Sequence, residues 1–256
     1  MPDSVEEALE NGRAASPTGR TGMSQVQNPD ELYAVLMQER PKFHGEHDGK
    51  TLSQPAVWDW SLHPAVLRWL IKHLRPGLRT LETGCGYSTV AFTLWGCQHH
   101  VVAPFPEEQQ SIVEWCLKHG VSVETVTYHS GWSQRVLPVM TPTPLDLEII
   151  DGDHAVPVPL LDYYYTADWL VEGGLLLVDD VQLRSVQQLS DFLDTETLRW
   201  EFVEQIARTR IYRKRVEGRV TGLLWNQQPF STASPSSPLR SFLYRGLRKI
   251  KRTLAG

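Results

Sequence analysis

The sequence has few cysteines and no long apolar run. The three cysteines of this 256-residue chain, Cys85, Cys97 and Cys116, are an odd number without Cys-x-x-Cys spacing. This argues against both a disulfide framework and a zinc site. No eighteen successive residues are apolar, and the first residues lack the basic and then apolar pattern of a secretory signal. These absences favour a protein of the reducing cytoplasm.

Charge is unevenly distributed along the chain. The formal net charge is −5, yet from Arg208 onward twelve Lys or Arg residues accompany a single acid, Glu217. The remainder is therefore strongly acidic, which disfavours generic nucleic-acid binding. We expect no nucleic-acid partner, whereas the basic C-terminal part could contact an anionic surface.

Length and composition predict one folded domain with less ordered ends. Residues 1–25 contain few large apolar side chains and are predicted to be a disordered tail. Residues 26–77 are predicted to form N-terminal helices or a lid, and residues 78–226 the core. Residues 227–256 combine a Ser/Pro-rich linker with a basic amphipathic helix. This helix could lie peripherally on a membrane, bind a partner or stay a flexible solubilising tail.

Within the predicted core, short apolar segments alternate with segments of helical periodicity. The expected strands are 78–82, 99–103, 121–128, 145–150 and 175–178, and the expected helices are 88–95, 107–119 and 159–170, the last closed by Gly173 and Gly174. Continuous apolar strands indicate a parallel sheet covered by helices on both faces. Residues 200–205 and 210–213 would add an antiparallel edge. We therefore predict a Rossmann-like, doubly wound α/β fold with a mostly parallel, seven-stranded sheet.

A glycine-rich turn follows the first predicted strand. Residues 81–89 read Leu-Glu-Thr-Gly-Cys-Gly-Tyr-Ser-Thr. Gly84 and Gly86 would allow a tight turn and a close approach to a ligand, while the start of the next helix attracts anionic groups. Thr89 stands where a dinucleotide-binding fingerprint has its third glycine. The turn therefore favours a cofactor with an amino-acid end over a dinucleotide.

Acidic residues follow the fourth and fifth predicted strands. Asp151, Asp153 and His154 come after the fourth strand, and Asp179 and Asp180 after the fifth. Ligands bind at the carboxyl ends of strands in a doubly wound sheet. If these two strands are neighbours, the carboxylates lie close together and either share a proton or bind a cation such as Mg²⁺.

These motifs resemble those of class I S-adenosylmethionine-dependent methyltransferases. The strand-end acid, glycines and hydroxyls of residues 82–89 resemble motif I of that family, and Asp-Gly-x-His with Gly-Gly and Asp-Asp is similar to a broad bacterial group of it. The aspartates are distantly like those of catechol and caffeoyl-CoA O-methyltransferases. The resemblance covers about residues 78–213. It implies S-adenosylmethionine as cofactor and methylation of an oxygen on a small-molecule or glycan-like acceptor.

The resemblance also implies roles for individual residues. His154 and Asp151 would be catalytic, with His154 in place of the family's lysine base, and Asp151, Asp179 and Asp180 would hold Mg²⁺. Asp180 stands where the family has asparagine, and the second strand lacks an acid at its end for the ribose. The residues expected to bind the cofactor are Glu82, Gly84, Cys85, Gly86, Ser88, Thr89, Glu107, Gly131, Trp132, Ser133, Asp151 and Asp153.

Other interpretations stay open at this point. The glycines could merely shape a turn, Asp179 and Asp180 could cap the next one, and His154 could be an ordinary loop histidine. Two other functions are a non-catalytic binding protein on the same fold and, less favoured, an NAD-type oxidoreductase. The sequence does not reveal the acceptor or the oligomeric state.

Overall fold

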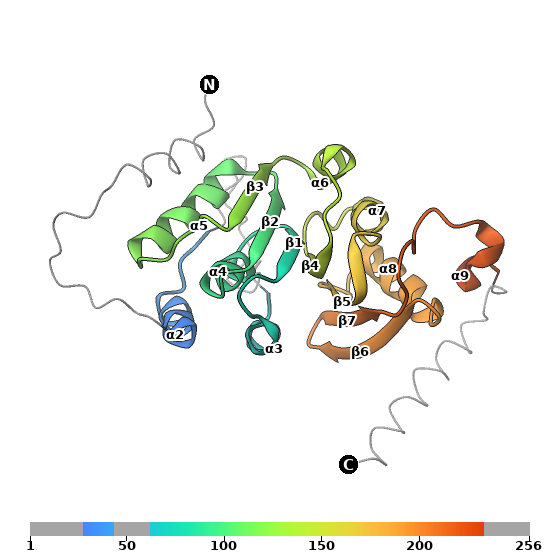
Figure 1. Cartoon of the computed structure of the whole chain (residues 1–256), viewed down its shortest axis with the longest axis horizontal. Helices are drawn as coiled ribbons and strands as arrows, with labels where there is room; N and C mark the ends of the chain where they lie inside the picture. The colour runs from blue at the N-terminus through green and yellow to red at the C-terminus, as the bar shows by residue number, and fades with distance from the viewer. Residues whose placement is uncertain (1–27, 44–61, 233–256) are drawn as a thin grey trace, which may run out of the picture. The chain divides into compact units, whose positions relative to one another are not determined.

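The computed structural model describes residues 28–43 and 62–232 and divides the chain into two units, Met1–Thr221 and Gly222–Gly256 (Figure 1). The second unit contains a 3-10 turn, η3 (Trp225–Gln227), and a short helix, α9 (Pro229–Thr232). The expected N-terminal tail and most of the expected linker and basic helix lie outside the described residues. None of the helices in the described ranges has the length and apolar character that a bilayer crossing requires.

The first unit is built on one seven-stranded sheet in the order β3-β2-β1-β4-β5-β7-β6. Its strands are β1 (Arg79–Thr83), β2 (Gln98–Ala103), β3 (Val126–Ser130), β4 (Leu145–Ile150), β5 (Leu170–Val178), β6 (Trp200–Ile206) and β7 (Thr209–Lys214). The first five strands pair in parallel, and β7 and β6 add an antiparallel edge. The predicted Rossmann-like fold is confirmed.

Helices cover both faces of this sheet because alternate strand residues are apolar on each side. Leu147, Ile149 and Leu177 pack with α3 and α4, whereas Leu176 and Val178 pack with α7 and α8. The helices of this unit are α2 (Pro29–Glu39), α3 (Pro64–His73), α4 (Tyr87–Leu94), α5 (Pro106–Lys118), α6 (Ser133–Val136), α7 (Val158–Thr166) and α8 (Arg184–Thr195), with a 3-10 turn, η2 (Leu137–Val139).

The segment around Gly173 differs from the prediction. The helix expected over 159–170 ends at Thr166, and β5 already begins at Leu170. Gly173 does not close a helix: it lies inside β5 with φ 82°, where the pairing register between β4 and β5 shifts. A glycine in a strand often marks such a bulge. The prediction mistook this bulge for a helix end.

Two further elements were placed wrongly or left out. The strand expected over 121–128 begins only at Val126, because the preceding residues form a turn whose Val121 and Val123 are buried beside α5. Their alternation resembles that of a strand. Helix α8 was not predicted, although Val186, Leu189 and Leu193 form its buried face. The carboxyl ends of β2, β4 and β5 lie where the prediction put them, and β1 and β3 extend one and two residues further.

Candidate active site

The loop after β1 lies directly against the end of β4. Gly84 has φ 93°, and a Cβ atom there would come within 2.3 Å of the carbonyl oxygen of Asp151. The N–H of Asp151 in turn donates to the carbonyl of Thr83 at 3.1 Å. Only glycine satisfies both the backbone conformation and this contact. The glycine turn and the first acidic segment therefore form one continuous edge.

The carboxylate of Glu82 accepts hydrogen bonds from the start of the helix that follows this loop. Ser88 Oγ donates to it at 2.5 Å, the hydroxyl of Thr89 donates to its other oxygen, and His99 Nε2 lies 3.2 Å away. The N–H of Gly86 donates to Thr89 Oγ1 at 2.9 Å. Glu82 is 1% exposed. Its side chain thus fixes the loop and the first turn of α4 and does not line an open crevice.

His99 was not among the predicted site residues. Its buried ring stacks on Phe92 with 4.2 Å between centroids, and Nδ1 lies 2.8 Å from the hydroxyl oxygen of Thr80. Both ring nitrogens therefore have partners at β1. A polar side chain at a position expected to be buried in a parallel strand was the signal that could have found it.

An acidic side chain reaches the glycine loop from α5. Glu108 is 4% exposed, and its Oε2 lies 3.8 Å from Cys85 Sγ, whereas the expected Glu107 is exposed in the first turn of the helix. Burial, together with the charge of Glu108, raises the pKa of the Cys85 thiol far above its usual range. Cys85 is therefore a protonated loop residue and no nucleophile.

The segment after β3 carries an aromatic surface. The N–H of Gly131 donates to the carbonyl of Ala103 at 2.9 Å, which ties the ends of β3 and β2 together. Trp132 is 41% exposed and meets Phe105 edge to face, with 5.9 Å between ring centroids. Ser133 is buried at the start of α6. The exposed indole thus lies at the same carboxyl edge of the sheet as the glycine loop.

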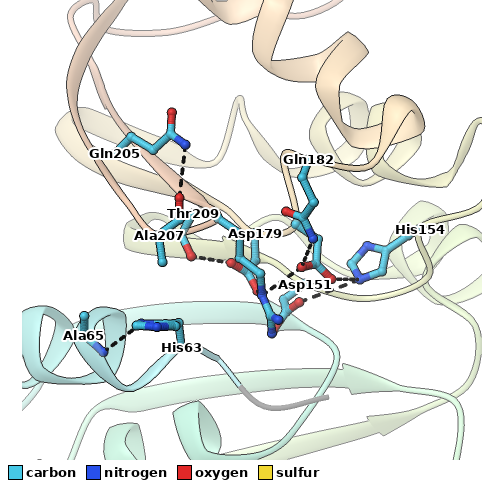
Figure 2. Close-up of polar contacts among 11 residues, drawn as sticks. His63, Ala65, Asp151, His154, Asp179, Gln182, Gln205, Ala207 and Thr209 are labelled. Carbon is cyan, nitrogen blue, oxygen red and sulfur yellow. Dashed lines mark hydrogen bonds and ion pairs between the residues drawn. The ribbon is translucent and has the colours of Figure 1, made fainter. Parts of the chain in front are cut away.

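Three side chains converge at the ends of β4 and β5. The Nε2 atom of His154 lies 3.0 Å from Asp180 Oδ2 and 3.9 Å from Asp151 Oδ1 (Figure 2). One ligand atom from each of these residues lies within 4.8 Å of the others. Asp153 does not join them, because its carboxylate accepts from the N–H of Ala155 at 2.8 Å and shapes the loop.

Asp179 adjoins this trio but is not part of it. It is fully buried, accepts a hydrogen bond from the hydroxyl of Thr209, and has Arg208 Nε 3.3 Å from its other oxygen. The next residue, Asp180, has a left-handed backbone with φ 54°, a conformation that aspartate tolerates better than most residues. The structure therefore adds His154 to Asp151 and Asp180, while the oxygens of Asp179 are taken by Thr209 and Arg208.

Comparison with known proteins relates part of this unit to a family. Residues 81–181 match the family model of a methyltransferase domain. This segment of the chain is therefore similar to a methyltransferase domain. No curated protein sequence matches the chain significantly.

Solved structures of methyltransferases share the fold of this unit at low sequence identity. The SAH-bound methyltransferase PaMTH1 of Podospora anserina is 15% identical over 84% of this chain and 98% of that one, with a TM-score of 0.54. The SAM complex of the O-methyltransferase TomG from Streptomyces achromogenes, involved in tomaymycin synthesis, is 14% identical over 84% and 100%, with a TM-score of 0.50.

Electrostatics distinguish the carboxylates of this candidate site. Burial, reinforced by Asp179 and Asp180, raises the pKa of Asp151, and burial also raises that of Asp179. Burial acts on Asp180 too, but hydrogen bonds from His154 and Gln182 and the charge of Arg208 outweigh it and lower the pKa. Asp180 is therefore the ionised carboxylate beside His154. If these carboxyl groups share one proton, Asp151 is the group that holds it.

The carboxylates do not fit a resident Mg²⁺ ion. Both oxygens of Asp180 already accept from the protein, because Gln182 Nε2 donates to Oδ1 at 2.8 Å and His154 lies against Oδ2. Both oxygens of Asp179 are likewise engaged. The remaining set would include a histidine, whereas Mg²⁺ prefers oxygen ligands and keeps waters. As arranged in this structure, these side chains therefore do not offer Mg²⁺ a set of uncommitted oxygen ligands, and the predicted magnesium site stays a prediction.

Buried polar atoms without hydrogen-bond partners lie near the end of β1. They are Thr83 Oγ1 and both carboxyl oxygens of Asp162, a fully buried residue of α7. Burial raises the pKa of Asp162 to about 6, an effect that Ser133 and Thr83 oppose. Ser133 and Thr83 are thus close to Asp162, although neither makes a well-formed hydrogen bond to it. Such uncommitted groups suit a site that receives a polar ligand.

Proposed function

We propose that this methyltransferase transfers the methyl group of S-adenosylmethionine to an oxygen atom of a small-molecule or glycan-like acceptor. The observation that carries the proposal is the contact between Gly84 and the backbone of Asp151. Through it, the loop expected to hold the cofactor adjoins the segment that positions His154. Cofactor and base would then act on one acceptor atom.

The cofactor would lie across the ends of β1, β2 and β3. The backbone of the loop from Gly84 to Gly86 would hold the methionine end, with Glu82 fixing that loop. Glu108, and not Glu107, would receive the ribose hydroxyls, because it is the acid that faces Cys85 from the first turn of α5. The exposed indole of Trp132 would stack on the adenine, as aromatic side chains commonly do with bases.

His154 would serve as the base. When bound, S-adenosylmethionine supplies an electrophilic methyl group on its sulfonium. Since His154 Nε2 faces Asp180, its Nδ1 is the nitrogen left to accept the proton of an acceptor hydroxyl. Asp180 would hold the ring in this orientation and stabilise the imidazolium that forms. The acceptor oxygen gains the methyl group, and the cofactor leaves as S-adenosylhomocysteine.

An oxygen acceptor agrees with this chemistry, because a histidine and carboxylate pair removes a proton from a hydroxyl as the bond forms. The similar structure TomG is an O-methyltransferase, so the fold accommodates acceptors of this kind. The acidic main part of the chain disfavours nucleic acid as the acceptor.

Calorimetric titration with S-adenosylhomocysteine, once in Mg²⁺ and once in EDTA, tests the proposal. Micromolar binding in both buffers is expected, followed by a screen of hydroxyl-bearing acceptors for S-adenosylhomocysteine release. NADH is the matched control ligand and should not bind. Binding of NADH alone would favour the oxidoreductase, and binding of neither would overturn the methyltransfer proposal.

A further inference from the structure

Arg208 brings a positive charge to the carboxylates from the antiparallel edge of the sheet. It lies in the hairpin between β6 and β7, next to Ala207, whose φ of 50° makes the tight turn. Its Nε atom is 2.8 Å from Asp180 Oδ1 and 3.3 Å from Asp179 Oδ2. One guanidinium thus contacts both aspartates that follow β5.

The hairpin is fastened to the end of β5 by backbone and side-chain contacts. The N–H of Val181 donates to the carbonyl of Arg208 at 3.0 Å, and the hydroxyl of Thr209 donates to Asp179 (Figure 2). Within the hairpin, Gln205 Nε2 donates to the carbonyl of Ala207 at 3.1 Å. These contacts fix the backbone on both sides of the guanidinium, so its position beside the carboxylates is built into the fold.

The donors around Asp179 and Asp180 leave no oxygen of either residue without a partner. At Asp179, the hydroxyl of Thr209 contacts Oδ1 and Arg208 contacts Oδ2. At Asp180, Arg208 and Gln182 both contact Oδ1, and His154 contacts Oδ2. A divalent ion would have to displace these donors. It would also be repelled by the guanidinium, since charges a few ångströms apart near a protein surface interact by several kcal/mol.

We propose that Arg208 is the built-in counter-cation of the Asp179 and Asp180 pair, taking the place that a divalent metal would otherwise fill, so that methyl transfer here requires no metal. The second half of this inference rests on the proposed function. Arg208 is then a positioning residue: it holds Asp180 ionised and aimed at His154. The guanidinium charge is a permanent part of the chain, whereas the charge of a bound metal ion could exchange with solvent.

Mn²⁺ binding, followed by the electron paramagnetic resonance signal of the free ion, tests the first half without any turnover. Wild-type protein should leave Mn²⁺ free, and Arg208→Met should bind it about tenfold or more tightly, because a repelling charge is removed and carboxylates are released. Arg213→Met is the matched control, since Arg213 lies on β7, the strand that follows Arg208, but pairs with Glu201 in an exposed position. Arg208→Lys keeps the charge and should resemble wild type.

Turnover in EDTA tests the second half. Wild-type activity should be unchanged by EDTA, Arg208→Met should be slowed, and Mn²⁺ should restore part of its rate, while Arg208→Lys should retain more activity than Arg208→Met. Tight Mn²⁺ binding by the wild type, or loss of wild-type turnover in EDTA with S-adenosylhomocysteine binding intact, would overturn the inference. Failure to bind S-adenosylhomocysteine would instead overturn the proposed function, and Mn²⁺ binding would still decide the role of Arg208. A melting curve for each variant shows that it is folded.

Discussion

The Nε2 atom of His154 lies 3.0 Å from Oδ2 of Asp180, so the segments that follow β4 and β5 meet in one ion pair. The two strands are parallel neighbours, with Ile150 opposite Val178. Each residue of the pair is therefore held by a strand end a few positions away. This arrangement makes the role of each residue separable by substitution.

Replacing His154 should affect turnover and leave cofactor binding intact. His154→Ala is expected to slow methyl transfer by about a hundredfold or more, the usual contribution of a general base, with an unchanged S-adenosylhomocysteine affinity by calorimetry. Asp180→Asn should slow it less, because asparagine tolerates the left-handed backbone and still accepts from the ring. His73→Gln, at an exposed position of α3, is the control. Equal turnover of His154→Ala and wild type would remove His154 as the base.

Replacing Glu108 should weaken cofactor binding. Glu108→Gln removes a charge that faces the glycine loop, and loss of one charge-assisted hydrogen bond costs about 1.5–3 kcal/mol, at least about tenfold in affinity. Glu107→Gln is the matched control, because Glu107 precedes it in the same helix turn and is exposed. Titration with S-adenosylhomocysteine measures both. A larger effect at Glu107 than at Glu108 would reverse the assignment.

Two glycines with left-handed backbones should respond differently to alanine. Gly84 and Gly77 have φ of 93° and 79°, but an added Cβ meets the carbonyl of Asp151 only at Gly84. Gly77→Ala should cost about 1–2 kcal/mol for the backbone alone. Gly84→Ala should cost about 4 kcal/mol or more and weaken S-adenosylhomocysteine binding. Urea unfolding gives both values, and equal losses would mean that the contact with Asp151 relaxes freely.

The stability of the protein should depend on the ionisation of Asp162. Burial raises its pKa from 3.8 to about 6 against the opposing effects of Ser133, Thr83 and His154, with Asp153 acting in the same direction as burial. The native state therefore binds the proton more tightly than the unfolded chain. This contribution is fully present below pH 3.8 and is lost as the pH rises through about 6, a change of roughly 3 kcal/mol.

The variant Asp162→Asn removes that dependence. Its stability relative to wild type should therefore rise between about pH 4 and pH 7, as measured by urea unfolding at several pH values. Glu172→Gln, which changes an exposed carboxylate of β5, should show little such trend. A difference between Asp162→Asn and wild type that stays constant with pH would mean that Asp162 ionises alike in both states.

Much of the fold could be predicted because strand and helix periodicity are local properties. The strand predicted over 145–150 matches β4 at both ends, and the antiparallel edge was predicted from two short segments. The start of β5 could not be predicted, since Gly173 has the sequence signature of a helix end and only pairing with β4 shows it to be a bulge. Long-range pairing overrides that local signal.

The site was predicted in outline and not in detail. Parallel strands bring their ends together, so proximity of Asp151 to Asp180 followed from topology. Which of two successive aspartates faces His154 depends on a backbone angle at Asp180, and sequence alone does not give that angle. The contributions of His99 and Arg208 depend on contacts between residues far apart in the chain. Such contacts leave no local pattern.

The hairpin that carries Arg208 lies outside residues 81–181, the segment that matches the methyltransferase-domain model. The acidic residues are thus encoded within the matched segment, and the charge that balances them is encoded downstream. On this assignment, related enzymes could gain or lose a metal requirement by remodelling one edge turn, with the glycine loop and both aspartate motifs left intact. Metal dependence would then be set by the hairpin between β6 and β7, and it could differ between enzymes that share the glycine loop and the aspartate motifs.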